Sequence, residues 1–258
     1  MKERLDILLV ERRLTESREK AKWLIKNGYV LINERVIRKP GKRVENSYKI
    51  FLKAPFPYVG RGGLKLEAAL IHFSINVENK VCADIGASIG GFTDCLLKHG
   101  ALKVYAIDTA TDLLHPSLIC NKKQVVPLLG IDARKLEKIE EKVDIITVDI
   151  TFSSLKDLLP NIMKFLKSEG DLIVLVKPIF ETEFYRNHKF EIITDRKVLN
   201  NILLKLLEWS GENGIYPIAI IKSPVLGKGG SIEFFVHFKK DLHLYEYVNY
   251  DELIKGVL

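Results

Sequence analysis

The chain has 258 residues, of which 47% are hydrophobic and 28% are charged. This length and composition predict a folded globular protein of one or two domains and exclude disordered, collagen-like and coiled-coil proteins. The longest stretch without Asp, Glu, Lys or Arg runs only from Ala68 to Val77, far short of the ~18 apolar residues of a membrane helix. Charged residues also interrupt the first thirteen positions, which lack the apolar region of a secretory signal. We therefore expect a cytoplasmic protein without a membrane span.

The positive charge is concentrated at the beginning of the chain. The net charge is +7, but residues 1–60 contain 15 Lys and Arg against 7 Asp and Glu, whereas residues 61–258 contain 25 against 26. A small basic segment joined to a nearly neutral one is typical of a polyanion-binding module attached to a separate working domain. A basic run can also be only a solvated face, and charge alone does not separate the two interpretations.

The cysteines and histidines do not indicate a metal site. The chain has three cysteines, Cys82, Cys95 and Cys120, without CxxC spacing, and its six histidines form no HxH or HxxxH pair. We expect reduced cysteines that fill apolar regions, with no disulfide framework and no bound metal.

The first fifty residues predict a small α+β domain. The expected elements are two helices and then three short strands, at residues 4–13, 17–27, 29–33, 36–38 and 48–53. Ser17 can cap the second helix, and Gly28 suits the left-handed turn that ends it. Arg18, Lys22 and Lys26 are spaced four apart, so they form a basic row beside the apolar face of this helix.

This segment resembles an S4 RNA-binding domain. The resemblance is carried by a Leu-Asp-x-Leu-Leu helix, a Ser-Arg-x-x-Ala helix, a Gly-x-Val strand and a Lys-Pro-Gly turn in the run RLDILLVERRLTESREKAKWLIKNGYVLINERVIRKPGKRV. It implies that the basic segment binds structured RNA, through contacts that are mostly to phosphates and sensitive to salt. The expected RNA-binding residues are Arg4, Arg12, Arg13, Ser17, Arg18, Lys22, Lys26, Arg35, Lys39, Lys42, Arg43 and Arg61.

The rest of the chain alternates strands with helices. We expect an S4 domain at 1–53, a stiff Pro-containing linker at 54–60 and a second domain at 61–258. Continuous apolar strands that alternate with helices predict a parallel sheet covered on both faces. The later run at 231–237 could be an edge or antiparallel strand. The expected strands of the parallel part are 81–85, 103–108, 124–129, 143–150 and 171–177, and the clearest helices are 64–73, 92–99 and 154–167.

A glycine-rich turn follows the first strand of the second domain. It has the sequence DIGASIGGF from Asp84 to Phe92, and its glycines let the backbone approach a ligand at the carboxyl end of the strand. Ser88 stands where a dinucleotide-binding turn needs its middle glycine, so nicotinamide and flavin cofactors are disfavoured. The turn instead resembles motif I of the class I S-adenosylmethionine methyltransferases.

This resemblance implies S-adenosylmethionine as the cofactor. Asp108, which ends the next strand, would bind the cofactor's ribose hydroxyls, and Asp132, after the third strand, would bind the adenine amino group. A glycine-rich turn alone can be only a tight connection, but here both acids follow it at the matching positions. The expected cofactor-binding residues are Asp84, Gly86, Ala87, Ser88, Gly90, Gly91, Phe92, Asp108, Asp132 and Asp149.

Four charged residues stand at positions that suggest catalysis. Asp149 and Lys177 each end an apolar strand, where an ionised group is costly to bury without a function. Lys65 lies on the helix before the first strand and Glu233 in the late strand, and each alone could be only solvated. Together the four match the Lys-Asp-Lys-Glu tetrad of the FtsJ-like RNA ribose methyltransferases, which implies that all four are catalytic.

The whole chain resembles the hemolysin A (TlyA) family of ribosomal RNA 2′-O-methyltransferases. The motifs YVGRGGLKLEAAL, DIGASIGGFTD, VDITFSSL, LVKPIFE and SIEFF follow the order of that family. The resemblance implies an α/β class I methyltransferase fold, with a Rossmann-like, mostly parallel seven-stranded sheet, after the small S4 domain. It also implies a ribosomal RNA or subunit as partner and the ribose of a cytidine as substrate. The first S4 helix is expected within a few residues of the start of the given sequence, as in the family's short form. This resemblance favours RNA of the large ribosomal subunit as the substrate.

Several residues depart from the family pattern. Ile89 replaces a threonine, TATDLL at 109–114 replaces Gly-x-x-Gln-Leu, Ile179 replaces a glutamine, and the glycine-free ETEFYRNHKFEI at 181–192 replaces a glycine-rich loop. These changes leave a second function open, that of a catalytically idle RNA-binding or ribosome-assembly factor. Cytolysis, which the family name suggests, is a remote third because no signal, span or amphipathic membrane helix supports it.

Overall fold

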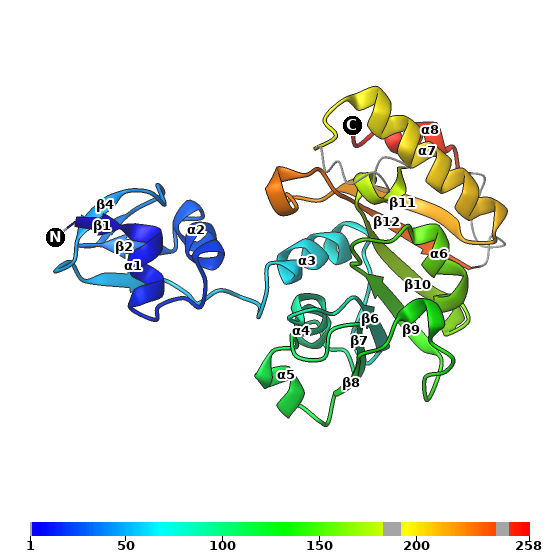
Figure 1. The fold of residues 1–258 in the computed structure, drawn as a ribbon, viewed down its shortest axis with the longest axis horizontal. Helices are drawn as coiled ribbons and strands as arrows, with labels where there is room; N and C mark the ends of the chain where they lie inside the picture. The colour runs from blue at the N-terminus through cyan, green and yellow to red at the C-terminus, as the bar shows by residue number, and fades with distance from the viewer. Residues whose placement is uncertain (1, 183–191, 241–247) are drawn as a thin grey trace. The chain divides into compact units, whose positions relative to one another are not determined.

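The computed structural model of the protein describes residues 2–182, 192–240 and 248–258. The chain divides into two compact units, Met1–Arg61 and Gly62–Leu258 (Figure 1). Most of the glycine-free loop expected at 181–192 lies outside the described residues.

The first unit packs two helices against short strands. Strands β1 and β4 form one antiparallel pair, and β3, β2 and β5 form a three-stranded antiparallel sheet in that order. Its core joins apolar side chains of both helices, including Leu5 and Leu9 of α1 with Leu24 and Ile25 of α2. The elements are β1 (Lys2–Arg4), α1 (Leu5–Glu11), α2 (Arg18–Lys26), β2 (Val30–Ile32), β3 (Arg35–Val36), β4 (Arg43–Glu45) and β5 (Ile50–Leu52).

The start of the first helix was predicted wrongly. Lys2–Arg4 form a strand because they pair with β4, and α1 begins only at Leu5, whose amide donates to the carbonyl of Lys42. The caps of the second helix are confirmed. The Ser17 side chain accepts from the amide of Lys20, and Gly28 has a φ of +79°. Phe56, in the expected linker, packs edge-on against Trp23 with ring centroids 5.1 Å apart.

The second unit confirms the predicted α/β fold with a mostly parallel seven-stranded sheet (Figure 1). The strand order is β11-β12-β10-β9-β6-β7-β8, and β12 runs antiparallel to both of its neighbours. The strands are β6 (Val81–Ile85), β7 (Lys103–Asp108), β8 (Val125–Leu129), β9 (Val143–Val148), β10 (Leu166–Val176), β11 (Tyr216–Lys222) and β12 (Phe234–Lys239). The helices are α3 (Gly62–His72), α4 (Gly91–Lys98), α5 (Pro116–Cys120), η1 (Ala133–Lys135), α6 (Leu155–Ile162), η2 (Pro178–Glu181), α7 (Arg196–Glu212), η4 (Lys228–Gly230) and α8 (Tyr250–Lys255).

The structure changes two expectations about this sheet. The helix expected at 154–167 ends at Ile162, because Leu166 already pairs with Val143 and β10 then continues past an irregularity in its register. The late strand β12 is antiparallel, which was one of the two possibilities expected, but it is internal rather than at an edge, since β11 covers its outer side. It begins at Phe234, so Glu233 lies just before the strand and not within it.

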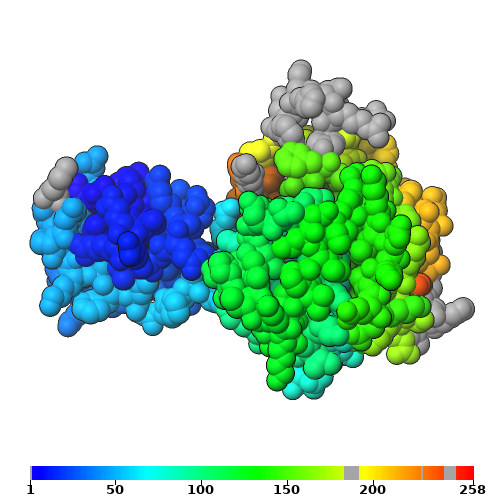
Figure 2. All heavy atoms as spheres, turned by 60° about the horizontal axis from the view of Figure 1, so that its bottom comes forward, coloured from blue at the N-terminus to red at the C-terminus, as the bar shows by residue number. Residues whose placement is uncertain are grey.

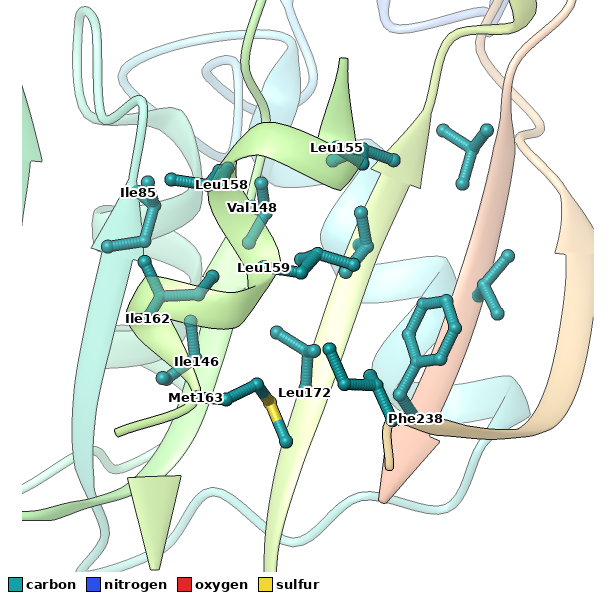
Figure 3. Close-up of a cluster of buried hydrophobic side chains, with 14 of the residues drawn as sticks. Ile85, Ile146, Val148, Leu155, Leu158, Leu159, Ile162, Met163, Leu172 and Phe238 are labelled. Atoms are coloured by element: carbon teal, nitrogen blue, oxygen red, sulfur yellow. The ribbon is translucent and has the colours of Figure 1, made fainter. Parts of the chain in front are cut away.

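Apolar side chains of the helices pack against both faces of the sheet. Figure 3 shows α6 lying across the strands, where its residues Leu155 and Leu159 gather in one apolar cluster with Val148 and Leu172 of the sheet. Leucines of α7, among them Leu203, join the same buried cluster. Because side chains alternate along a strand, the intervening residues of β9 point to the opposite face, where α4 contacts β6 and β7. Because β6 to β10 run parallel to one another, their carboxyl ends all lie along the same edge of the sheet.

Figure 2 shows one face of the second unit, on which atoms from the middle of its sequence, coloured green, are gathered. Among the residues that the structure describes, no helix combines the length and apolar character needed to cross a membrane. No group of His, Cys, Asp and Glu side chains in these residues has the arrangement of a metal site.

Candidate active site

The glycine-rich turn brings the backbone after β6 close to the end of β9. Gly86 has a φ of +81°, and a side-chain carbon at this position would lie 2.4 Å from the carbonyl oxygen of Asp149. No other residue type fits such an approach without a backbone shift. Gly90, with a φ of +93°, precedes α4, and a Cβ there would collide with Leu118. The turn therefore needs both glycines for shape.

Asp84, at the end of β6, is buried below this turn. Its carboxylate accepts hydrogen bonds from the hydroxyl of Thr93 on α4 at 2.7 Å and of Thr147 on β9 at 3.1 Å. Burial raises the pKa of Asp84 to about 7, although both hydroxyl bonds act in the opposite direction. The carboxylate thus ties three elements together beneath the turn.

A cavity of about 600 Å³ opens at the carboxyl ends of β6, β7, β9 and β10. This volume lies in the range of small-molecule sites. An adjoining cavity of about 110 Å³ lies against the glycine-rich turn and the start of α3. The larger cavity is lined by Gly86, Ser88, Asp108, Asp132 and Asp149, and the smaller by Gly86, Ala87, Ser88, Gly91, Phe92 and Asp149, all of them expected cofactor-binding residues. Asp84 and Gly90 line neither cavity.

The acids of the larger cavity have different surroundings. Asp108 accepts hydrogen bonds from the backbone amides of Ser88 at 2.7 Å and Ala110 at 2.8 Å, which fix its carboxylate at the cavity. Asp132 caps η1 and is paired with the guanidinium of Arg134, whose hydrogen bonds lower the pKa of Asp132. The sequence did not predict this pairing. The Asp132 carboxylate, which was expected to accept from an adenine amino group, already accepts hydrogen bonds from Arg134.

The four expected catalytic residues form two ion pairs. Lys177 Nζ lies 2.5 Å from Asp149 Oδ1, without the geometry of a directed hydrogen bond, and donates to the carbonyl of Ile150 at 2.9 Å. Lys65 Nζ lies 2.6 Å from Glu233 Oε2, and the two side chains are 11% and 4% exposed. Asp149 and Lys177 line the large cavity, whereas Lys65 and Glu233 line neither cavity.

Two aromatic residues flank this cavity and were not predicted as site residues. Phe152 lines it and is 65% exposed, and its ring centroid lies 5.6 Å from that of Phe180 on η2. Phe152 also has a φ of +63°, which is strained for a bulky residue. The sequence signal was present, since VDITFSSL and LVKPIFE place an aromatic residue three positions after Asp149 and Lys177.

Glu181 connects the two loops that carry these aromatic residues. Its carboxylate accepts from the Ser154 hydroxyl at 2.7 Å and from the Leu155 amide at 2.9 Å. Burial raises the pKa of Glu181 despite these two hydrogen bonds. No sequence pattern marks Glu181 as a site residue, because its contacts with the start of α6 come from a distant loop.

The expected RNA-binding residues of the first unit have varied contacts. The buried carboxylate of Asp6 accepts from Arg4 Nε at 3.0 Å and from an Arg18 guanidinium nitrogen at 3.1 Å, and the bond from Arg4 is the main cause of its lowered pKa. Arg12 donates to the backbone carbonyls of Tyr48 and Asn46. Lys22 is half-buried and Ser17 is occupied as a helix cap. The remaining expected residues are exposed: Arg13, Lys26, Arg35, Lys39, Lys42, Arg43 and Arg61.

Two protein-family models match the chain. The S4 domain model matches residues 3–50, and the FtsJ-like methyltransferase model matches residues 58–240. The first unit and the site-bearing unit thus each belong to a known domain type.

Relatives match over nearly the whole chain. Hemolysin A of Brachyspira hyodysenteriae is 38% identical over 242 residues, which cover 91% of this chain and 99% of that protein. The 16S/23S rRNA (cytidine-2′-O)-methyltransferase TlyA of Mycobacterium tuberculosis is 34% identical, with 90% of this chain and 88% of that protein covered. The 23S rRNA (cytidine-2′-O)-methyltransferase TlyA of Campylobacter jejuni is 32% identical, with 90% and 98% covered.

Solved structures share the same architecture. A hemolysin candidate from Streptococcus thermophilus has a TM-score of 0.73 and 33% identity, and covers 99% of this chain and 95% of its own. A methyltransferase-like protein from Listeria monocytogenes, 15% identical with a TM-score of 0.54, shares the fold of the second unit. The chain therefore belongs to the hemolysin A (TlyA) family, in which an S4 domain precedes an FtsJ-like methyltransferase domain.

Proposed function

We propose that this protein transfers a methyl group from S-adenosylmethionine to the ribose 2′-hydroxyl of a cytidine in ribosomal RNA, with the large subunit favoured. The observation that carries the proposal is the Asp149–Lys177 ion pair, which lines the large cavity beside the glycine-rich turn. Two TlyA relatives are named for methylation of cytidine 2′-hydroxyls in rRNA, one of 16S and 23S rRNA and one of 23S rRNA alone.

The lining of the large cavity suits the proposed cofactor. Asp108 presents a carboxylate held by two backbone amides, a suitable acceptor for a pair of ribose hydroxyls. Asp108, Asp132 and Asp149 line the cavity together with Arg134 and Lys177, which pair with the last two acids. The carboxylates exceed the cations by one, and negative charge favours a cationic sulfonium. S-adenosylmethionine, when bound, supplies the electrophilic methyl group.

Lys177 is the proposed general base. Asp149 and the Ile150 carbonyl hold its nitrogen at the cavity. As an ammonium Lys177 cannot act as a base, so it must first release one proton to solvent. The neutral amine can then accept the proton of a 2′-hydroxyl placed there, while the oxygen attacks the methyl carbon and the bond from that carbon to the sulfonium sulfur breaks. An in-line displacement depends mainly on alignment, which can supply ~7 to 11 kcal/mol. Lys65 and Glu233 are the other two proposed catalytic residues, and Glu233 positions the Lys65 ammonium in a buried pair.

The first unit is proposed to hold the RNA. Its basic side chains are mostly exposed, and the second unit carries almost no net charge with which to bind a polyanion. Exposed lysines and arginines give salt-dependent phosphate contacts, so the S4 unit would supply most of the affinity and the second unit the chemistry.

Two measurements test the proposal. Titration calorimetry of the full chain should show S-adenosylmethionine binding, and mass spectrometry of ribosomal RNA should show a cytidine ribose methylation that disappears when the gene is deleted. Binding of RNA without any binding at millimolar S-adenosylmethionine would instead favour the catalytically idle RNA-binding factor. An unchanged methylation map would contradict both the proposed reaction and its substrate.

A further inference from the structure

Two loops carry the proposed catalytic ion pair, and they leave adjacent parallel strands. Asp149 begins the loop after β9, and Lys177 begins the loop after β10. Both side chains border a cavity and are partly exposed, 24% for Asp149 and 13% for Lys177. The sheet fixes the backbone where each loop begins, since the Asp149 amide donates to the Ile85 carbonyl. A single, partly exposed ion pair holds its two side chains only weakly, so contacts between the two loops bear on the geometry of the pair.

Glu181 joins these two loops at their far ends. It closes η2, four residues after Lys177, and accepts from the hydroxyl and the amide at the start of α6, from Ser154 at 2.7 Å and Leu155 at 2.9 Å. Both carboxylate oxygens are used. A carboxylate at a helix N-terminus is also favoured by the helix dipole, so the loop after Lys177 is fastened to the helix that follows the Asp149 loop.

The loop that Glu181 fastens is strained. Phe152, between Asp149 and Ser154, has a φ of +63°, and such a conformation in a bulky residue persists only where the surroundings determine it. Its ring also packs against Phe180, the neighbour of Glu181 in sequence. Contacts from η2 therefore hold the Asp149 loop at two points.

We propose that Glu181 is a positioning residue, which fixes the Asp149 loop against the Lys177 loop and thereby sets the geometry of the Asp149–Lys177 pair. The inference rests on the proposed function, because it assigns Glu181 a role in the same methyl transfer. If Glu181 were only a helix cap, its loss would weaken the fold and leave the turnover of folded protein unchanged.

The test compares Glu181→Ala with a matched cap elsewhere. Asp195 caps α7 through the amides of Lys197 and Val198 and lines neither cavity of the site. We expect Glu181→Ala to lower kcat for methyl transfer to ribosomal RNA about 10- to 100-fold, the range of small misplacements, with KM for both substrates within about twofold. Asp195→Ala should lower the Tm by a similar amount and keep kcat within about twofold.

Glu181→Gln provides the rescue. Its amide oxygen can accept from the Leu155 amide while its NH₂ donates to the Ser154 hydroxyl, which also serves as an acceptor. We expect kcat within about threefold of the wild type. Ser154→Ala removes one of the two bonds together with the cap that the Ser154 hydroxyl provides for the Lys156 amide. It should lower kcat by about threefold or more, beyond the effect of the cap loss in Asp195→Ala, and it serves as the test if Glu181→Ala does not fold.

Crystal structures give a readout that does not depend on activity. The Asp149–Lys177 distance should lengthen or become variable in Glu181→Ala and stay near the wild-type value in Glu181→Gln and Asp195→Ala. Wild-type kcat in folded Glu181→Ala, or an unchanged pair in its structure, would overturn the inference. If the wild-type protein itself transfers no methyl group, the proposed function fails, and the crystallographic comparison still decides the role of Glu181.

Discussion

Lys177 Nζ and Asp149 Oδ1 lie 2.5 Å apart at the ends of two adjacent parallel strands, β10 and β9. Each residue follows an apolar strand that the sheet buries, so their backbone positions are fixed by the register of the sheet. The ion pair brings the proposed base into the large cavity, which makes Lys177 the most direct residue to test.

Lys177→Ala should abolish methyl transfer, because the proposed proton acceptor is lost. Lys177→Arg should be equally inactive, since a guanidinium keeps its proton. RNA affinity and S-adenosylmethionine affinity should change by less than about threefold in both variants, as measured by filter binding and calorimetry. Lys205→Ala, at an exposed position on α7, is the control. Wild-type turnover in Lys177→Ala would contradict the assignment of the four catalytic residues.

Lys65→Met should destabilise the fold by roughly 3 to 5 kcal/mol, because it leaves the buried carboxylate of Glu233 without its ion-pair partner. The double variant Lys65→Met/Glu233→Gln should recover a large part of this loss, since no unpaired charge remains. Urea unfolding of the three proteins measures the difference. A loss below about 1 kcal/mol in the single variant would show that water or another group compensates Glu233.

Asp84→Asn should change how stability depends on pH. The pKa of Asp84 rises from 3.8 to about 7 on folding, so its contribution is fully present below about pH 4 and is lost as the pH rises through about 7. The shift corresponds to roughly 4 kcal/mol at most.

Asparagine does not ionise, so Asp84→Asn should gain stability relative to the wild type between pH 5 and pH 8. Urea unfolding at several pH values measures this gain, and Asp157→Asn, at an exposed position on α6, is the control. A stability difference that stays constant over this range would mean that Asp84 is not the titrating group.

Lys22→Gln/Lys26→Gln should weaken binding to ribosomal RNA and make it less sensitive to salt. If both lysines of α2 contact phosphates, the slope of log K against log salt should fall by about 1.5 to 2. Affinity for S-adenosylmethionine should not change, because the large cavity is lined by residues of the second unit alone. Equal losses of RNA and cofactor binding would refute the division of labour between the two units.

The sequence predicted the parts of the fold that have local signals. Apolar strands that alternate with helices predicted the five parallel strands of the sheet, whereas its total of seven was implied by the family resemblance. The caps at Ser17 and Gly28 follow from residue type. Strand β4 escaped prediction because three residues have no detectable period, and Lys2–Arg4 form a strand only by pairing with it. Edge strand β11 was missed although it contains Ile218, Ile220 and Ile221.

The candidate site was predicted as residue identities rather than as contacts. Spacing placed Asp149 and Lys177 at strand ends, and the structure puts both at one cavity. The roles of Asp84 and Glu181 depend on partners from other segments, Thr147 and Ser154 among them. A sequence pattern within one segment cannot encode such partners, because only the folded sheet brings those segments together.

The antiparallel direction of β12 has a consequence for the order in which the site can form during synthesis. Glu233 stands before the first residue of β12, yet it meets Lys65 on α3, 168 positions earlier in the chain. During synthesis, Lys65 therefore has no Glu233 carboxylate to pair with until almost the whole protein has emerged from the ribosome. The buried Lys65–Glu233 pair can therefore form only after Glu233 has left the exit tunnel.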